Sequence, residues 1–279
     1  MKIALSIIAV TVLNVISSSH IFASSRSVSD NRSLLEQLDK LVAERSSYMD
    51  KRRAKADSVE ILINETVDVG RQLQLYLEQA RLWSGISSDS AVSVCNRGLH
   101  LSMSAGDSTY VQEFFIERAS AFFNRGQVHD CIDDLNHVEN VGLRPGIERH
   151  FHYVGFAIYL TLGAFYEHDE QWTNYLAQGR RHLIAHKRFL GNDSCAVRYC
   201  DALINMVDGK KKVMASNLLK VVSMTDESDE IYPYANTVLG EYFMGAGNYD
   251  EAVYYYAKGA ITNIRNYYCP LKFFEQLKN

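Results

Sequence analysis

The feature that most constrains this sequence is a succession of glycine-marked turns between segments whose apolar residues recur at helical spacing. The turn signals stand at Gly85, Gly106, Gly126, Gly142 to Gly146, Gly191 to Asp193, Gly209 and Gly247. Glycine commonly ends a helix because it adopts a left-handed backbone without steric cost. Only 3 prolines interrupt the chain, which favours helices over a turn-rich β-sandwich. The pattern predicts an all-α chain of short helices joined by tight turns.

The clearest unit of this pattern covers residues 234–260, which read YANTVLGEYFMGAGNYDEAVYYYAKGA. We expect Gly240 and Ala252 to face each other where two antiparallel helices cross, because larger side chains would hold the helices apart. Gly247 should end the first helix with a left-handed backbone. Three aromatic residues should fill the space between helix pairs, namely Phe243, Tyr249 and Tyr256.

These residues stand at the offsets that define the tetratricopeptide repeat (TPR), a helix-turn-helix unit of about 34 residues, which the window therefore resembles. The slots are held by Leu239, Gly240, Phe243, Gly247, Tyr249, Ala252, Tyr256 and Gly259. The window departs from the repeat at Asn236, where tryptophan is usual, and at Ile264, where proline is usual. The resemblance implies a stack of antiparallel helix pairs.

Further copies are less complete. In residues 113–138 the matching residues are Ala119, Phe122, Gly126, Val128, Cys131 and Leu135, whereas Arg118 stands where leucine is expected. Partial copies lie at 89–107, with Ala91, Cys95 and Gly98 in second-helix slots, at 202–221, and around Leu162-Gly163. Because the two best copies are not separated by a multiple of the repeat length, we expect an irregular TPR-like array, a right-handed α-solenoid.

The N-terminal residues indicate export. Lys2 precedes a 14-residue apolar run from Ile3 to Ile16 and a small-residue site at Ala23. This is the layout of a signal peptide, and the run is shorter than the about 20 residues of a spanning helix. We expect residues 1–23 to be removed and the rest to be soluble in the periplasm or secreted, without stable membrane insertion. A retained anchor is the alternative.

The remaining organisation follows from periodicity. We expect a linker at 24–32, an amphipathic leader helix at 33–60, TPR-like repeats at 61–266 and a tail at 267–279. The leader helix, the irregular repeats and the closing AI…NIRN of residues 260–266 together resemble the extracytoplasmic part of a bacterial regulator family whose catalogued domain has unknown function.

That resemblance implies a TPR region outside the membrane, followed by a spanning helix, a coiled coil and a DNA-binding helix-turn-helix inside. Residues 267–279 contain none of these later parts, so we expect either a stand-alone exported relative, possessing the sensing part alone, or a truncated remnant. The formal net charge of −4 shows no basic excess, and we expect no nucleic-acid partner for this chain.

Five cysteines form no evident disulfide framework. Cys195 and Cys200 could pair only if the helix were broken between them, and we favour buried, apolar roles for most of the five. No phosphate-binding loop, nucleophile elbow or paired-cysteine zinc motif occurs, so we expect no enzyme, no catalytic residue and no cofactor. His182 and His186 lie four residues apart, and with His150, His152 and His168 they could in principle ligate zinc, but we favour exposed histidines on a basic helix over a metal site.

Repeat proteins bind ligands along the face made by the first helix of each pair. The residues at the inward offsets of the two best copies are Tyr234, Thr237, Glu241, Met244, Glu113, Ile116, Ser120 and Phe123. This mixture of aromatic, aliphatic and acidic side chains favours a protein or peptide partner, extended or helical and of basic character. The 17 tyrosines leave a glycan-binding nutrient-uptake accessory protein as the alternative.

Overall fold

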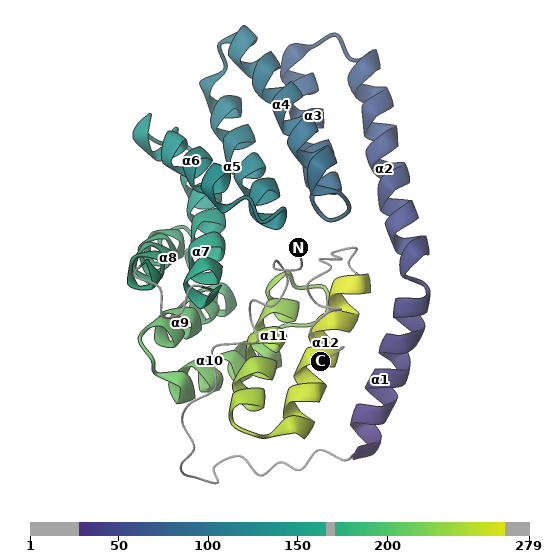
Figure 1. Cartoon of the computed structure of the whole chain (residues 1–279), viewed down its shortest axis with the longest axis vertical. Coiled ribbons are helices and arrows are strands. Elements are labelled where there is room, and N and C mark those ends of the chain that lie inside the picture. Colours follow the sequence, from purple (N-terminus) through teal and green to yellow (C-terminus); the bar gives the residue numbers. More distant parts are fainter. Residues whose placement is uncertain (1–27, 166–170, 266–279) are drawn as a thin grey trace. The chain divides into compact units, whose positions relative to one another are not determined.

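The computed structural model describes residues 28–165 and 171–265, and within these ranges it contains twelve α-helices and no strand (Figure 1). Their bounds are α1 Val28–Ala43, α2 Arg45–Glu65, α3 Val69–Ser84, α4 Ser88–Ala105, α5 Ser108–Asn124, α6 Val128–Asn140, α7 Glu148–Phe165, α8 Trp172–Lys187, α9 Ser194–Val207, α10 Lys211–Met224, α11 Ile231–Gly245 and α12 Tyr249–Arg265. The all-α prediction is confirmed. The predicted signal peptide and C-terminal tail lie outside the described residues.

The helices belong to two compact units. Unit 1 combines residues 1–46 with 159–279, and unit 2 covers residues 47–158. Among the described residues, unit 2 therefore holds most of α2, all of α3 to α6 and the beginning of α7. Unit 1 holds α1, the end of α7 and α8 to α12.

The same packing pattern recurs in both units. In unit 2, α3 packs on α4 and on α5, and α4 also packs on α5. In unit 1, α9, α10 and α11 form the same three contacts. Each first helix of a pair thus contacts its own second helix and the first helix of the next pair, which is how neighbouring units of a helical repeat array bury their apolar faces. The predicted repeat array is confirmed, and α3, α5, α9 and α11 are first helices.

In the sequence, the pair α7–α8 was indicated only by Leu162-Gly163. The structure shows which residues allow these two helices to pack closely. A Cβ atom on Gly163 would lie 2.5 Å from a methyl carbon of Leu176. A Cβ atom on Gly179 would lie 2.6 Å from a methyl carbon of Leu160. Each helix therefore presents a leucine to a glycine of the other, and α7 is the first helix of this pair.

Three intra-pair turns use glycine as expected. Gly126, Gly209 and Gly247 have φ angles of 76°, 72° and 73° and connect α5 to α6, α9 to α10 and α11 to α12. Side chains with a Cβ atom rarely adopt this left-handed conformation. The repeating turn is therefore a direct consequence of the glycine pattern.

The last pair, α11–α12, is closely packed, although two expectations about it need correction. Leu239 and Ala252 are fully buried, and Phe243 stacks on Tyr255 with ring centroids 5.4 Å apart. The atoms nearest to Gly240 belong to the Tyr256 ring and not to Ala252, since a Cβ atom on Gly240 would lie 2.7 Å from that ring.

Tyr249 does not fill the space between helix pairs, because 65% of it is exposed. It is the first residue of α12, directly after the turn. Side chains of a helix tilt toward its N-terminus, so one at the first position extends past the helix end into solvent.

The consensus departure at Arg118 has a structural explanation. Its guanidinium forms two hydrogen bonds of 2.8 and 2.7 Å to the Asp134 carboxylate on α6 and a third, of 2.6 Å, to Asn96 on α4. It also lies over the rings of Phe115 and Phe122. The apolar stem of the arginine thus takes the place of the usual leucine side chain, and its charge is paired with a carboxylate.

The expected leader helix at 33–60 is divided into α1 and α2, which meet at Glu44 and belong mostly to different units. Within unit 1, α1 packs on α12, and the Asn31 amide donates a hydrogen bond of 2.9 Å to the backbone oxygen of Asp250. Within unit 2, Arg52 of α2 donates to the backbone oxygen of Leu82 on α3. The two parts of the leader therefore cover different helices.

Cys195 and Cys200 are free thiols, so the alternative of a disulfide between them is not realised. Burial raises the pKa of Cys131 and of Cys200 to about 12, which keeps both as neutral, apolar side chains. His182 and His186 are 1% and 6% exposed, contrary to the expectation of a solvated pair. His182 stacks on Tyr159, because α8 packs this face against α7.

Candidate interaction surface

First helices of successive pairs in unit 2 bring four ionisable side chains together. Arg81 comes from α3, Glu113 and Glu117 from α5, and His150 from α7, and we call these four residues the Arg81 cluster. Glu113 and Glu117 are one turn apart and therefore share a face of α5. Because α3 packs on α5, that face lies toward Arg81.

The four groups are in mutual contact. Arg81 Nε donates a short hydrogen bond to Glu117 Oε1, and its Nη2 lies 3.5 Å from Glu113 Oε2. His150 Nδ1 lies 2.8 Å from Glu113 Oε2, and its Nε2 lies 3.6 Å from Glu117 Oε1. The side chains of Glu113, Glu117 and His150 are 19%, 10% and 26% exposed, whereas that of Arg81 is 52% exposed. The cluster is half-buried, with Arg81 as its solvent-facing member.

Neighbouring charges decide the direction of the pKa shifts of Glu113 and His150. Burial raises the pKa of Glu113, but the hydrogen bond and charge of His150 and the charge of Arg81 outweigh burial and bring that pKa below its usual value. Burial lowers the pKa of His150, but the hydrogen bond to Glu113 and the charges of Glu117 and Glu113 raise it overall. The charges of the two carboxylates are therefore compensated by Arg81 and His150.

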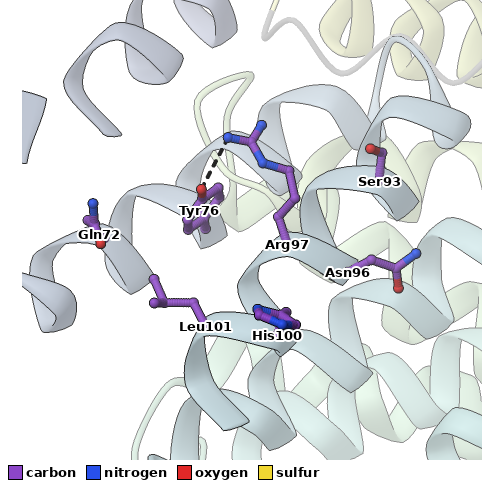
Figure 2. Close-up of a pocket in the computed structure, with 7 residues that line it drawn as sticks. All are labelled: Gln72, Tyr76, Ser93, Asn96, Arg97, His100 and Leu101. Carbon is purple, nitrogen blue, oxygen red and sulfur yellow. Dashed lines mark hydrogen bonds between the residues drawn. The ribbon is translucent and has the colours of Figure 1, made fainter. Parts of the chain in front are cut away.

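A second feature of unit 2 is a shallow depression of about 550 Å³ between α3 and α4 (Figure 2). Its lining residues all carry a polar group except Leu101, and they are Gln72, Tyr76, Ser93, Asn96, Arg97, His100 and Leu101. Arg97 donates two hydrogen bonds, of 3.0 and 2.8 Å, to the Glu60 carboxylate and a third, of 3.1 Å, to the Tyr76 hydroxyl. Its charge is already paired, so the depression does not have the character of an anion-binding site.

The predicted groove residues of α5 have different surroundings. Glu113 belongs to the Arg81 cluster, whereas Ile116 is fully buried and cannot contact a ligand. Ser120 and Phe123 are half-buried. Arg81 and Glu117 were not singled out from the sequence, although the spacing of Glu113 and Glu117 on one helix face was a usable signal. His150 was considered only as one of several histidines that could ligate zinc.

The predicted groove residues of α11 lie in unit 1, and they also differ from one another in exposure. Tyr234 and Met244 are 37% and 44% exposed and remain candidates for a ligand contact. Thr237 is 3% exposed, and its hydroxyl donates a hydrogen bond of 2.9 Å to the backbone oxygen of Pro233. Thr237 therefore has a structural position rather than a groove position.

Glu241 does not present its carboxyl group to an open groove. Its Oε1 is buried and makes no hydrogen bond. Burial holds the pKa of Glu241 well above its usual value, and burial followed by the Glu241 charge raises the pKa of Tyr256. Burial thus disfavours the charged form of the carboxyl group.

Replacing Glu241 by glutamine should stabilise unit 1 at neutral pH more than at acidic pH. For an acid whose folded pKa exceeds its unfolded value, native stability falls as pH rises from the ordinary glutamate pKa toward the folded pKa. Glu241→Gln removes this titration, so its advantage in urea unfolding should grow from about pH 4.5 to neutral pH. Glu230→Gln, at an exposed position, is the control. If the unfolding free energy of Glu241→Gln differed from that of the wild type by the same amount at every pH, the raised pKa of Glu241 would be refuted.

The glycine turns, the first-helix contacts and the interhelical glycines define a tetratricopeptide-repeat protein. More particularly, the chain belongs to the family of the SusR N-terminal TPR domain, whose model matches residues 42–268. This confirms the predicted resemblance to a TPR-containing regulator family. No curated protein matches the chain.

A solved structure of a TPR protein agrees with the fold. The thermophilic TPR protein TTC0263 of Thermus thermophilus is 18% identical, with a TM-score of 0.53, and the match covers 74% of this chain and 100% of that one. BtubC (BKLC) from P. vanneervenii is 14% identical, with a TM-score of 0.46, and the match covers 82% of this chain and 91% of that one. Separately, none of the described helices is long and apolar enough to cross a bilayer.

Proposed function

We propose that this protein is an exported TPR module that binds a protein or peptide partner through the first helices α3, α5 and α7 of unit 2. TPR folds generally serve as non-enzymatic scaffolds for protein interactions, and first helices supply their binding face. The observation that carries the proposal is the Arg81 cluster, which places two half-buried carboxylates on that face.

The chemistry of the cluster specifies the partner. A lysine or arginine of a bound segment can replace Arg81 on Glu113 and Glu117, because Arg81 is the exposed member of the network and the carboxylates are not. Such an exchange favours a basic peptide over an acidic one. Export rests on residues 1–23, and a sensing role in a regulator rests on the family to which residues 42–268 belong.

The proposal is tested by cross-linking in intact cells with a C-terminally tagged chain. We expect mass spectrometry to show a protein that begins near Ser24, in the envelope fraction, cross-linked to one dominant partner through α3, α5 or α7. A full-length chain in the cytoplasm would refute export. Cross-links restricted to second helices would refute the proposed face.

Variants make the test specific. Glu113→Gln combined with Glu117→Gln should lower the recovery of that partner by about tenfold, roughly 1.4 kcal/mol of binding free energy. The control is Asp133→Asn, an exposed carboxylate of α6, which should leave recovery unchanged. Higher salt should lower the recovery of the partner with the wild-type chain toward the level seen with the double variant, because salt screens the attraction between charges. Equal recovery with all three proteins would contradict the role of the cluster.

A further inference from the structure

Three side chains of the Arg81 cluster are metal-ligand types that converge from two helices. Glu113, Glu117 and His150 each offer one ligand atom, and these atoms all lie within 4.8 Å of one another. The set is more than a group of surface acids, because it is half-buried and includes an imidazole from α7. Imidazole with carboxylate suits Zn²⁺ and related transition ions, whereas Mg²⁺ and Ca²⁺ prefer oxygen alone.

The distances are close to those of a bound ion. Zinc bonds to nitrogen or carboxylate oxygen are about 2.0–2.2 Å long, so two tetrahedral ligands of one ion are about 3.3–3.6 Å apart. The three ligand atoms lie within 4.8 Å of one another, so they have to approach by up to about 1.5 Å to reach the tetrahedral separation. Rotation of the glutamate side chains can provide this movement while α5 and α7 stay in place.

The ring of His150 lies between the two carboxylates. Its Nδ1 lies 2.8 Å from Glu113 and its Nε2 lies 3.6 Å from Glu117. A ring nitrogen without a proton carries a lone pair that can bind a metal ion. An ion at this point would therefore be bound by the imidazole and the carboxylate oxygens together.

We propose that Glu113, Glu117 and His150 form a binding site for one divalent transition-metal ion, with Zn²⁺ as the probe. The site goes beyond the proposed partner binding and does not depend on it. Three protein ligands leave one tetrahedral position for water or for a group of a partner. Arg81 competes with the ion for both carboxylates and moves away on binding, which its 52% exposed side chain permits.

Isothermal titration of ZnCl₂ into the chelator-treated mature chain at about pH 7.5 tests the site. We expect a stoichiometry of one ion per chain. His150→Gln and Glu117→Gln should each weaken binding at least about tenfold, as expected for the loss of a ligand. Arg81→Met should tighten binding, because it removes the competing cation.

His100→Gln is the matched control, since His100 is an exposed histidine of α4 in the same unit. Circular dichroism and zinc-induced thermal stabilisation identify any variant that fails to fold, and the isosteric Glu117→Gln then replaces His150→Gln as the deciding variant. The absence of zinc binding overturns the proposal. So does binding that both ligand variants retain, that His100→Gln abolishes, or that Arg81→Met weakens.

Discussion

Gly98→Ala should destabilise unit 2 by about 3 kcal/mol, the upper part of the range for overpacking a core. Gly98 is buried in α4, and a Cβ atom there would lie 2.2 Å from Cζ of Phe114 on α5. Phe114 is fully buried, so its ring has no free space into which to move. Alanine normally favours a helix over glycine by about 1 kcal/mol, so a net loss must come from this contact.

Urea unfolding followed by far-ultraviolet circular dichroism measures the change in the free energy of unfolding. Gly85→Ala is the control, because Gly85 has a φ angle of −86° that alanine adopts freely. The nearest atoms to its added Cβ belong to the guanidinium of Arg52, at 3.2 Å, and a shift of this group by a few tenths of an ångström relieves the contact. We expect a change within about 0.5 kcal/mol for this control. Equal midpoints for the two variants would contradict the packing of α4 on α5.

Sequence reasoning succeeded where the decisive interaction is local. The turns at Gly126, Gly209 and Gly247 follow from a conformation that glycine alone adopts easily, and all three have positive φ angles. Gly98 was placed in a second-helix slot, and the structure gives the reason, since no larger residue fits against Phe114. Spacing within one helix pair is therefore enough to predict its crossing points.

Sequence reasoning failed where burial depends on distant helices. Consensus offsets place Thr237 and Glu241 toward a groove, but the structure buries the Thr237 side chain and the Oε1 atom of Glu241. His182 has polar neighbours in the sequence and still stacks on Tyr159 of the preceding helix. Periodicity identifies a face of a helix, but the covering helix decides whether that face is open.

The candidate site was the least predictable part. Glu113 was singled out, whereas His150 and Arg81 approach it from 37 and 32 residues away along the chain. Their meeting requires that α3, α5 and α7 be the first helices of successive pairs, and α7 carried the weakest repeat signal of the three. The contact between Asn31 and Asp250, 219 residues apart, was equally beyond reach from local pattern.

Leu239→Ala should destabilise unit 1 by about 2–5 kcal/mol, the range for deleting a buried leucine side chain. Leu239 is fully buried in a core that contains Ala202 of α9, Leu218 of α10 and Ala252 of α12. Four helices contribute to this core, so the surrounding backbone is held from several sides and cannot close the cavity that alanine leaves.

Met244→Ala on the same helix is the matched control, because Met244 is 44% exposed and lies outside this core. It should cost less than about 1 kcal/mol in urea unfolding. Hydrogen exchange should also show faster opening of α9 to α12 for Leu239→Ala than for wild type, since these helices share the core. Comparable losses for the two variants would mean that Leu239 does not occupy the core position that the repeat alignment gives it, and the assignment of α11 and α12 as the last TPR pair would then fail.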